Sequence, residues 1–197
     1  EAITSLLPLA GELGIVLAIE NHFKATGWDY PEFAQAPEVF RALVEEAEPR
    51  LRSAAQLPWI ARLETELDNV RAALDRAVRA GDEAEAGAIV LATGWFWWLR
   101  NHRQEAVAWV RLVLRLGVAL DTLPAGAPAD EVRARAETVD PVGAFLATPD
   151  GEAGHPLREL RMDLRMLDLF LTAETGTENV AADARAREYL ARVRAAY

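Results

Sequence analysis

The stretch from residue 60 to residue 117 carries apolar residues at intervals of three and four, and this spacing predicts packed α-helices. Gly81 follows the first run as a left-handed stop. Asp82 is then expected to be the N-cap of a second helix, with Glu85 three residues later in the position that completes a capping box. The first run consists of Ile60, Leu63, Leu67, Val70, Leu74 and Ala77.

The second predicted helix, residues 84–99, is apolar on almost every side, which is typical of a helix with neighbours on both flanks. A turn at Asn101 and His102 leads to a third helix. The apolar face of that helix comprises Ala106, Val110, Val113 and Gly117, widened by Trp109, Leu112 and Leu116.

The remaining segments also read as helices and loops. Five prolines and four glycines in residues 121–156 indicate a loop-rich connection around short helices near 130–138 and 141–147. Helices are expected at 3–24 and 37–47. After Pro156, which suits a first helical turn, a further helix is predicted from Leu157, Leu160, Leu164, Leu167 and Leu171, ending at Gly176. Thr177 is the expected N-cap of a last helix with a thin face of Ala182, Ala186, Tyr189 and Val193.

Composition narrows the class of protein. A hydrophobic fraction of 51% over 197 residues is ample for a core. The absence of cysteine excludes disulfides and thiolate chemistry and suits a reducing cytoplasm. The net charge of −10 weighs against direct nucleic-acid binding. No apolar run reaches the roughly 20 residues that span a bilayer, so no membrane association is expected.

Residues 87–120 resemble a single tetratricopeptide repeat (TPR). The resemblance implies that Gly94 on the first helix faces Ala106 on the second, so that the two helices approach closely. Glu105 stands where an acidic residue commonly precedes the second small position. Asn101 takes the place of the usual turn glycine, and it also tolerates the left-handed conformation. The expected fold class is all-α, with antiparallel helix pairs in a TPR-like right-handed superhelix or bundle.

A wider string is similar to the C-terminal helical region of large bacterial transcriptional regulators, the signal-transduction (STAND) ATPases of the AfsR/SARP and LuxR-type (MalT-like) groups. The similarity covers about residues 41–120, with a weaker match over 156–175. It implies a regulatory region whose ATPase and DNA-binding modules lie elsewhere in the parent protein. The string comprises Glu46 to Leu51, Trp59 to Leu74, Gly81 with Asp82, Trp95 to Arg100, and Glu105 to Trp109.

No catalytic or metal-binding pattern is recognisable. His22, His102 and His155 stand far apart, without the spacing of metal ligands. The carboxylate pair of Glu64 and Asp68 sits at helical spacing beside arginines, which is typical of a solvated face with ion pairs. We expect no catalytic residues, no metal and no cofactor, and a chain that is not itself an enzyme.

Four of the six tryptophans fall within fifteen residues, and the TPR register divides them. Val90, Gly94 and Trp97 are expected between helices. Leu91, Trp95 and Trp98 are expected toward a concave groove, where Arg100 or Arg103 would bind a carboxylate or phosphate. In the alternative reading, the N-terminal helix or the 157–171 helix covers these tryptophans.

The sequence thus divides into an N-terminal helical segment (1–57), a TPR-like core (58–120), a loop-rich connection (121–156) and a C-terminal helix pair (157–197). The expected function is sensing or protein interaction in a cytoplasmic transcription regulator. The expected partner is a protein, a peptide, or a small apolar or anionic ligand. Two alternatives stay open: a structural scaffold that holds another domain or a second copy of the chain, and, less favoured, an enzyme with a helical active-site pocket.

Overall fold

All regular elements in the described part of the chain are α-helices, as the apolar spacing predicts. The structure is a computed structural model that describes residues 36–147, 152–175 and 184–196. The helices are α2 (Pro37–Arg50), α3 (Gln56–Arg79), α4 (Glu83–Leu99), α5 (Arg103–Thr122), α6 (Ala129–Thr138), α7 (Pro141–Ala147), α8 (Arg158–Thr175) and α9 (Ala184–Ala196).

The turn between α3 and α4 contains the predicted N-cap, but the second hydrogen bond of a capping box is missing. Gly81 adopts a φ of 72°, and an Asp82 carboxylate oxygen accepts from the Glu85 backbone N–H at 2.9 Å. The reciprocal bond of a capping box is not formed, because the Asp82 N–H donates to a carbonyl of α3 and the Glu85 carboxylate lies 3.2 Å from Arg41 of α2. The next turn contains Asn101 at a φ of 61°, which confirms its left-handed conformation.

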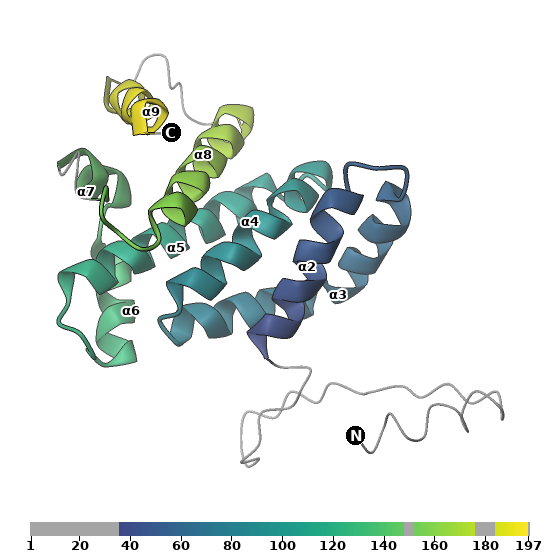
Figure 1. Ribbon diagram of the computed structural model, residues 1–197, viewed down its shortest axis with the longest axis horizontal. Coiled ribbons are helices and arrows are strands. Elements are labelled where there is room, and N and C mark those ends of the chain that lie inside the picture. Colours follow the sequence, from purple (N-terminus) through teal and green to yellow (C-terminus); the bar gives the residue numbers. More distant parts are fainter. Residues whose placement is uncertain (1–35, 148–151, 176–183, 197) are drawn as a thin grey trace, which may run out of the picture. The chain divides into compact units, whose positions relative to one another are not determined.

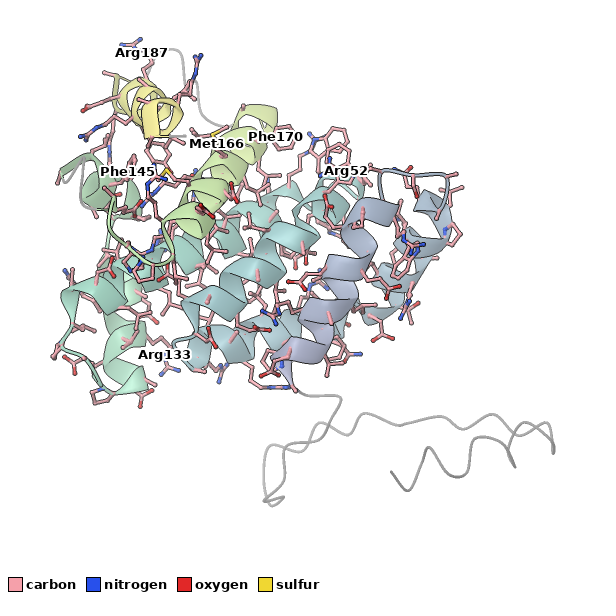
Figure 2. All side chains as sticks on the ribbon, viewed as in Figure 1. Arg52, Arg133, Phe145, Met166, Phe170 and Arg187 are labelled. Carbon is pink, nitrogen blue, oxygen red and sulfur yellow. The ribbon has the colours of Figure 1, made fainter. Side chains whose placement is uncertain are left out.

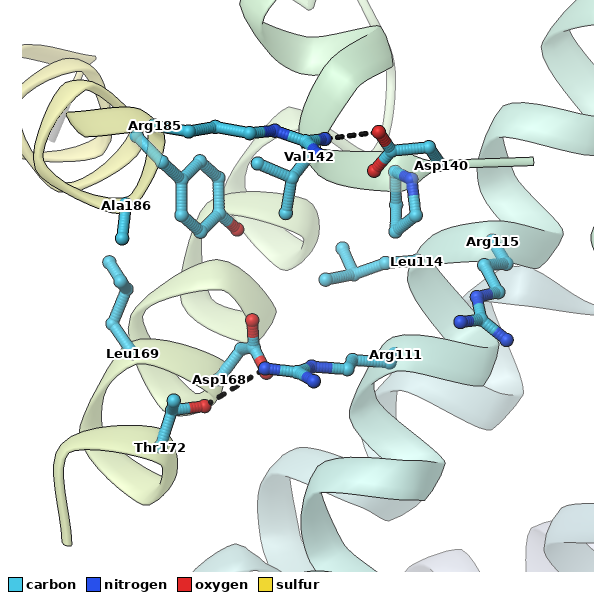
Figure 3. Close-up of a pocket in the computed structure, with 12 residues that line it drawn as sticks. Arg111, Leu114, Arg115, Asp140, Val142, Asp168, Leu169, Thr172, Arg185 and Ala186 are labelled. Carbon is cyan, nitrogen blue, oxygen red and sulfur yellow. Dashed lines mark hydrogen bonds and ion pairs between the residues drawn. The ribbon is translucent and has the colours of Figure 1, made fainter. Parts of the chain in front are cut away.

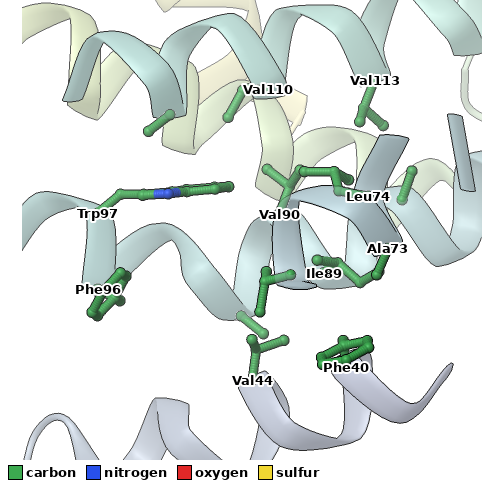
Figure 4. Close-up of a cluster of buried hydrophobic side chains, with 14 of the residues drawn as sticks. Phe40, Val44, Ala73, Leu74, Ile89, Val90, Phe96, Trp97, Val110 and Val113 are labelled. Carbon is green, nitrogen blue, oxygen red and sulfur yellow. The ribbon is translucent and has the colours of Figure 1, made fainter. Parts of the chain in front are cut away.

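Helix α4 lies at the centre of the packing and contacts α2, α3, α5 and α8. Figure 1 shows α2, α4 and α8 beside one another, with α3 and α5 behind them. Ile89 lies over Val44 of α2, and Trp97 lies against Val110 of α5 (Figure 4). Ile89, Val90 and Trp97 of α4 are fully buried, and so are Val44 and Val110 opposite them. Because α4 has neighbours on several sides, its sequence is apolar on almost every side.

The contact between α4 and α8 gives Gly94 a neighbour that the TPR register does not include. A Cβ atom built on Gly94 would lie 2.9 Å from the Leu167 Cδ2 atom of α8, and one built on Gly87 would lie 2.7 Å from the Leu160 Cδ2 atom. The space that a Gly94 side chain would occupy is therefore filled by Leu167 of α8. Both glycines lie on one face of α4, two turns apart, and their missing side chains make room for the leucine stripe of α8.

The two short helices predicted in the loop-rich segment are confirmed as α6 and α7, and each packs in a small cluster of its own. Val132 and Ala136 of α6 are buried in a cluster with the end of α5. Phe145 of α7 meets Tyr189 of α9 edge-on, with ring centroids 5.8 Å apart, and Val193 is buried in the same cluster. The C-terminal helices thus pack around an apolar cluster separate from the main core.

One predicted helix start differs slightly from the structure, and several other predicted features lie outside the described residues. Helix α8 begins at Arg158, so Pro156 precedes its first turn instead of occupying it. The expected helix at 3–24, the stop at Gly176, the cap at Thr177 and the apolar position Ala182 lie outside the described residues. Residues 36–197 form one structural unit. None of the described helices is both long and apolar enough to cross a membrane.

Candidate binding surface

Two tryptophans of α4 form a stacked pair at the surface of the helical unit. The ring centroids of Trp95 and Trp98 lie 4.6 Å apart, with an interplanar angle of 13°. Residues three apart in a helix lie on the same face, and both side chains are half-buried. The pair therefore presents a partly open aromatic surface instead of belonging wholly to the core.

Arginines lie beside both rings. The Arg52 guanidinium carbon, in the segment after α2, lies 4.6 Å from the Trp95 ring centroid. Arg103, in the first turn of α5, lies 5.9 Å from the Trp98 ring. An arginine at such distances interacts favourably with the indole face, by about 0.5–1 kcal/mol at an exposed site. Arg52 also pairs with Glu48 at 2.7 Å, which fixes its position.

Helix α8 extends the aromatic pair with its own apolar side chains. The Phe170 ring lies 6.2 Å from Trp98 at a tilt of 41°. Phe170 remains 41% exposed and Met166, one turn earlier, 38% exposed. Figure 2 shows both side chains on α8, with Arg52 after α2. We call Arg52, Trp95, Trp98, Arg103, Met166 and Phe170 the aromatic surface.

The structure brings together some of the residues expected to bind a ligand. Leu91 is half-buried and lies one turn before Trp95 on α4, and Arg103 contacts Trp98. Arg100 instead forms an ion pair with Glu64 of α3. Trp97 is fully buried, as expected.

The two interpretations of the tryptophan cluster meet at α8. The 157–171 segment does approach the tryptophans, as the alternative reading expects, because Phe170 contacts Trp98. Its exposed side chains nevertheless add to the apolar area that faces solvent. Helix α8 thus enlarges the apolar surface around Trp98 instead of shielding it from solvent.

Three members of the aromatic surface were not predicted from the sequence: Arg52, Met166 and Phe170. A signal for the last two was present, because Met166 and Phe170 are an apolar pair at i, i+4 that falls outside the leucine stripe of α8. Arg52 carried no such signal. It lies in a turn, and its contact with Trp95 depends on how α2 packs against α4.

The chemistry available at the aromatic surface is recognition. Stacked indole faces and a phenyl ring favour an apolar or aromatic side chain, and the adjacent guanidinium groups favour a carboxylate beside it. The indole N–H groups of Trp95 and Trp98 are buried and have no hydrogen-bond partner in the described structure.

Ion pairs elsewhere join helices. Arg71 of α3 donates to both carboxylate oxygens of Glu105 on α5, from Nε and Nη2 at 2.6 Å each. These hydrogen bonds lower the pKa of Glu105, against the opposing effect of burial. Burial raises the pKa of Glu85, which the charge of Arg41 only partly offsets. The acidic position Glu105, noted in the TPR resemblance, therefore connects α3 to α5.

A buried arginine of α8 also joins helices. Arg161, 2% exposed, donates from Nε and Nη2 to the Glu83 carboxylate at 2.6 and 2.7 Å. Its Nη1 donates to Asp121 at the end of α5, also at 2.6 Å. Arg165, one turn later, is buried and bound to Glu152. The leucine spacing of α8 gave no sign of these buried cations.

Within the described ranges, no three histidine or carboxylate side chains are grouped so that they could hold a metal ion. Comparisons of the chain with protein-family models, with curated proteins and with solved structures each return no match.

Proposed function

We propose that this chain is a sensor and protein-interaction region of a bacterial transcription regulator of the STAND ATPase type, acting in the cytoplasm by binding and not by catalysis. The partner is a protein segment that places an apolar or aromatic side chain on the aromatic surface, next to a carboxylate. Nucleotide hydrolysis and DNA binding belong to other modules of the parent protein.

The observation that carries this proposal is the continuous series of contacts from Arg52 through Trp95 and Trp98 to Phe170. Tryptophan and arginine are the residues most enriched among those that dominate binding energies at interfaces. Here they come from α4, from α5 and from the turn after α2, and they stand beside exposed apolar side chains of α8. The guanidinium groups of Arg52 and Arg103 beside the rings would donate to a partner's carboxylate, which at Arg52 would compete with Glu48.

The arrangement of α2, α4 and α8 side by side supports a TPR-like interpretation, since helical repeats bind their partners on a surface shared by successive helices. A partner that bridges α4 and α8 would bias how these helices pack. A shift in that packing is the proposed route by which binding reaches the ATPase module.

The test is selection of a random 12-residue peptide library on the intact chain. We expect enriched peptides to combine an aromatic or large aliphatic residue with Asp or Glu one to four positions away. Their binding should quench or shift the fluorescence of Trp95 and Trp98. Phe170→Glu should weaken binding at least tenfold, because it places a charge in the apolar contact and repels the peptide carboxylate.

The matched control is Leu57→Glu, since Leu57 is 75% exposed and lies outside the aromatic surface. It should leave peptide binding unchanged. Trp95→Ala and Trp98→Ala provide a second pair of variants, each checked for folding by its thermal transition. The proposal is wrong if no peptides are enriched, or if binding survives all three substitutions within the surface.

Self-association is the second candidate, because the exposed Phe170 and Met166 could meet the same surface of another copy. Sedimentation equilibrium of the isolated chain distinguishes the two. A stable dimer that Phe170→Glu dissociates and Leu57→Glu does not would favour the scaffold role. A monomer at micromolar concentration would favour the peptide-binding role.

A further inference from the structure

The two methionines of the chain both lie on α8, one turn apart, in different surroundings. Met162 is 3% exposed and belongs to the apolar cluster that α8 forms with α7 and α9. Met166 is 38% exposed and lies one turn before Phe170, within the aromatic surface. Because the chain has no cysteine, these two thioethers carry its only sulfur atoms.

The packing of α8 explains why one methionine is buried and the other exposed. The leucine stripe of α8 faces α4. Asp168 accepts a hydrogen bond from Arg111 of α5, as Figure 3 shows, and Met162 faces the cluster with α7 and α9. Since successive residues of an α-helix are about 100° apart around its axis, Met166 and Phe170 fall on the remaining side. Solvent therefore reaches Met166 while the helix is fully packed.

An exposed thioether reacts with a hydroperoxide by a two-electron step. A lone pair of the sulfur attacks one peroxide oxygen, so that a sulfur–oxygen bond forms while the oxygen–oxygen bond breaks. The proton of the transferred oxygen passes to the departing hydroxide, which becomes water. The sulfur is oxidised to a sulfoxide and the peroxide is reduced. The reaction requires access to the sulfur, so Met166 should react before Met162.

The product changes the chemistry of the aromatic surface at its α8 side. A sulfoxide is polar, whereas the thioether is a flexible apolar group that packs well against aromatic rings. A partner's apolar side chain placed on the surface would remove the sulfoxide oxygen from water, and burying a polar group without a hydrogen bond is unfavourable. Oxidation should therefore oppose binding.

We propose that Met166 is an oxidation site at which a hydroperoxide switches this side of the aromatic surface from apolar to polar and thereby weakens binding of the partner. The effect on the partner rests on the proposed function of the surface. The change in the surface itself does not, so the two are tested by separate measurements.

The first measurement is the rate at which hydrogen peroxide oxidises each methionine of the intact chain. Trypsin cleaves after Arg161, Arg165 and Arg185, so the two methionines fall in separate peptides, 162–165 and 166–185. Mass spectrometry should show oxygen added several-fold faster to 166–185 than to 162–165. In concentrated urea, where burial no longer protects Met162, the two rates should become similar.

The second measurement is retention of the chain on a hydrophobic-interaction column, which reports on apolar surface without any peptide. The chain oxidised at Met166 should elute earlier than the untreated chain. Met166→Leu conserves the apolar volume without an oxidisable sulfur, so peroxide should not change its retention. Met162→Leu is the matched control, and its retention should remain sensitive to peroxide.

The third measurement is the affinity for a library-selected peptide. Oxidation of Met166 should weaken binding about fivefold or more. Met166→Leu should bind equally well before and after peroxide. Met166→Gln, which introduces a polar amide without any oxidant, should weaken binding to a similar degree.

The outcomes separate the oxidation site from the proposed function. Earlier elution after oxidation, with no peptide bound by any form of the chain, would support the switch of the surface and refute the peptide-binding role. The oxidation site is overturned if both methionines react equally fast in the folded chain, or if oxidation leaves retention unchanged. It is also overturned if peroxide weakens peptide binding by Met166→Leu as much as by the unaltered chain.

Discussion

At the scale of single residues, Gly117 shows how a glycine accommodates a buried charge. A Cβ atom at this position would lie against the Glu83 carboxylate and 3.0 Å from the Arg161 Nη2 atom. Helix α5 therefore leaves room for the ion pair between α4 and α8. Breaking such a buried pair by removing one partner typically costs about 3–5 kcal/mol. Sequence periodicity identified Gly117 as a position on the packed face of α5 but not the charges it accommodates.

Gly117→Ala tests this directly. Helix propensity alone would favour alanine by about 1 kcal/mol, whereas displacing the buried pair should cost more. We expect a net loss of about 1–3 kcal/mol in the free energy of unfolding, measured by urea denaturation. The matched reverse change is Ala108→Gly, at an exposed position of the same helix, which should cost about 1 kcal/mol. A gain in stability from Gly117→Ala would contradict the packing described.

Glu105 gives a prediction of pH dependence. Because Arg71 lowers the folded-state pKa of Glu105, its contribution is fully present above the ordinary value of about 4.5 and is lost as pH falls through the lowered one. Glu105→Gln should reduce stability at pH 7 by about 1–2 kcal/mol. It should also flatten the acid side of the stability profile.

The matched control is Asp130→Asn, which removes a carboxylate paired with Arg133 at the surface. Because that carboxylate is largely exposed, the change should cost no more than about 0.5 kcal/mol at neutral pH. Thermal unfolding from pH 3 to pH 8 compares the two variants. Parallel profiles for Glu105→Gln and the unaltered chain would show that the Arg71 pair contributes nothing.

At the scale of helices, the sequence predicted the helices themselves but not that α8 packs against Gly94 of α4. Three-four spacing located α3, α5 and α8, and Asp82 marked the start of α4 correctly. The same spacing says which face of a helix is buried but not which helix covers it. The contact of Gly94 with Leu167 was not predicted for this reason. Since α4 is apolar on almost all sides, its pattern gave no means of distinguishing α5 from α8 as the neighbour of Gly94.

A double-mutant cycle tests the α4–α8 contact. Gly94→Val should cost about 1–3 kcal/mol, because its side chain would overlap Leu167. In a Leu167→Ala background much of this cost should disappear, giving a coupling energy of about 0.5–3 kcal/mol. An Ala106→Gly background should give no such rescue. Rescue by Ala106→Gly and not by Leu167→Ala would show that the added side chain meets α5 instead of α8.

At the scale of the whole helical unit, α8 joins the aromatic surface to the core. Its leucines pack on α4, and Phe170 and Met166 extend the aromatic surface. The sequence pointed to Trp95 and Trp98 because the repeat register placed them away from the core. The sequence could not predict the role of Arg52, since its contact with Trp95 joins segments far apart in the chain.

The most direct test of the binding function is the dissociation constant of one library-selected peptide, measured by tryptophan fluorescence on three forms of the chain. We predict that Phe170→Glu raises this constant at least tenfold, about 1.4 kcal/mol, while Leu57→Glu leaves it unchanged, with both variants folded. Equal affinity for all three forms, or an equal loss in both variants, would contradict the account.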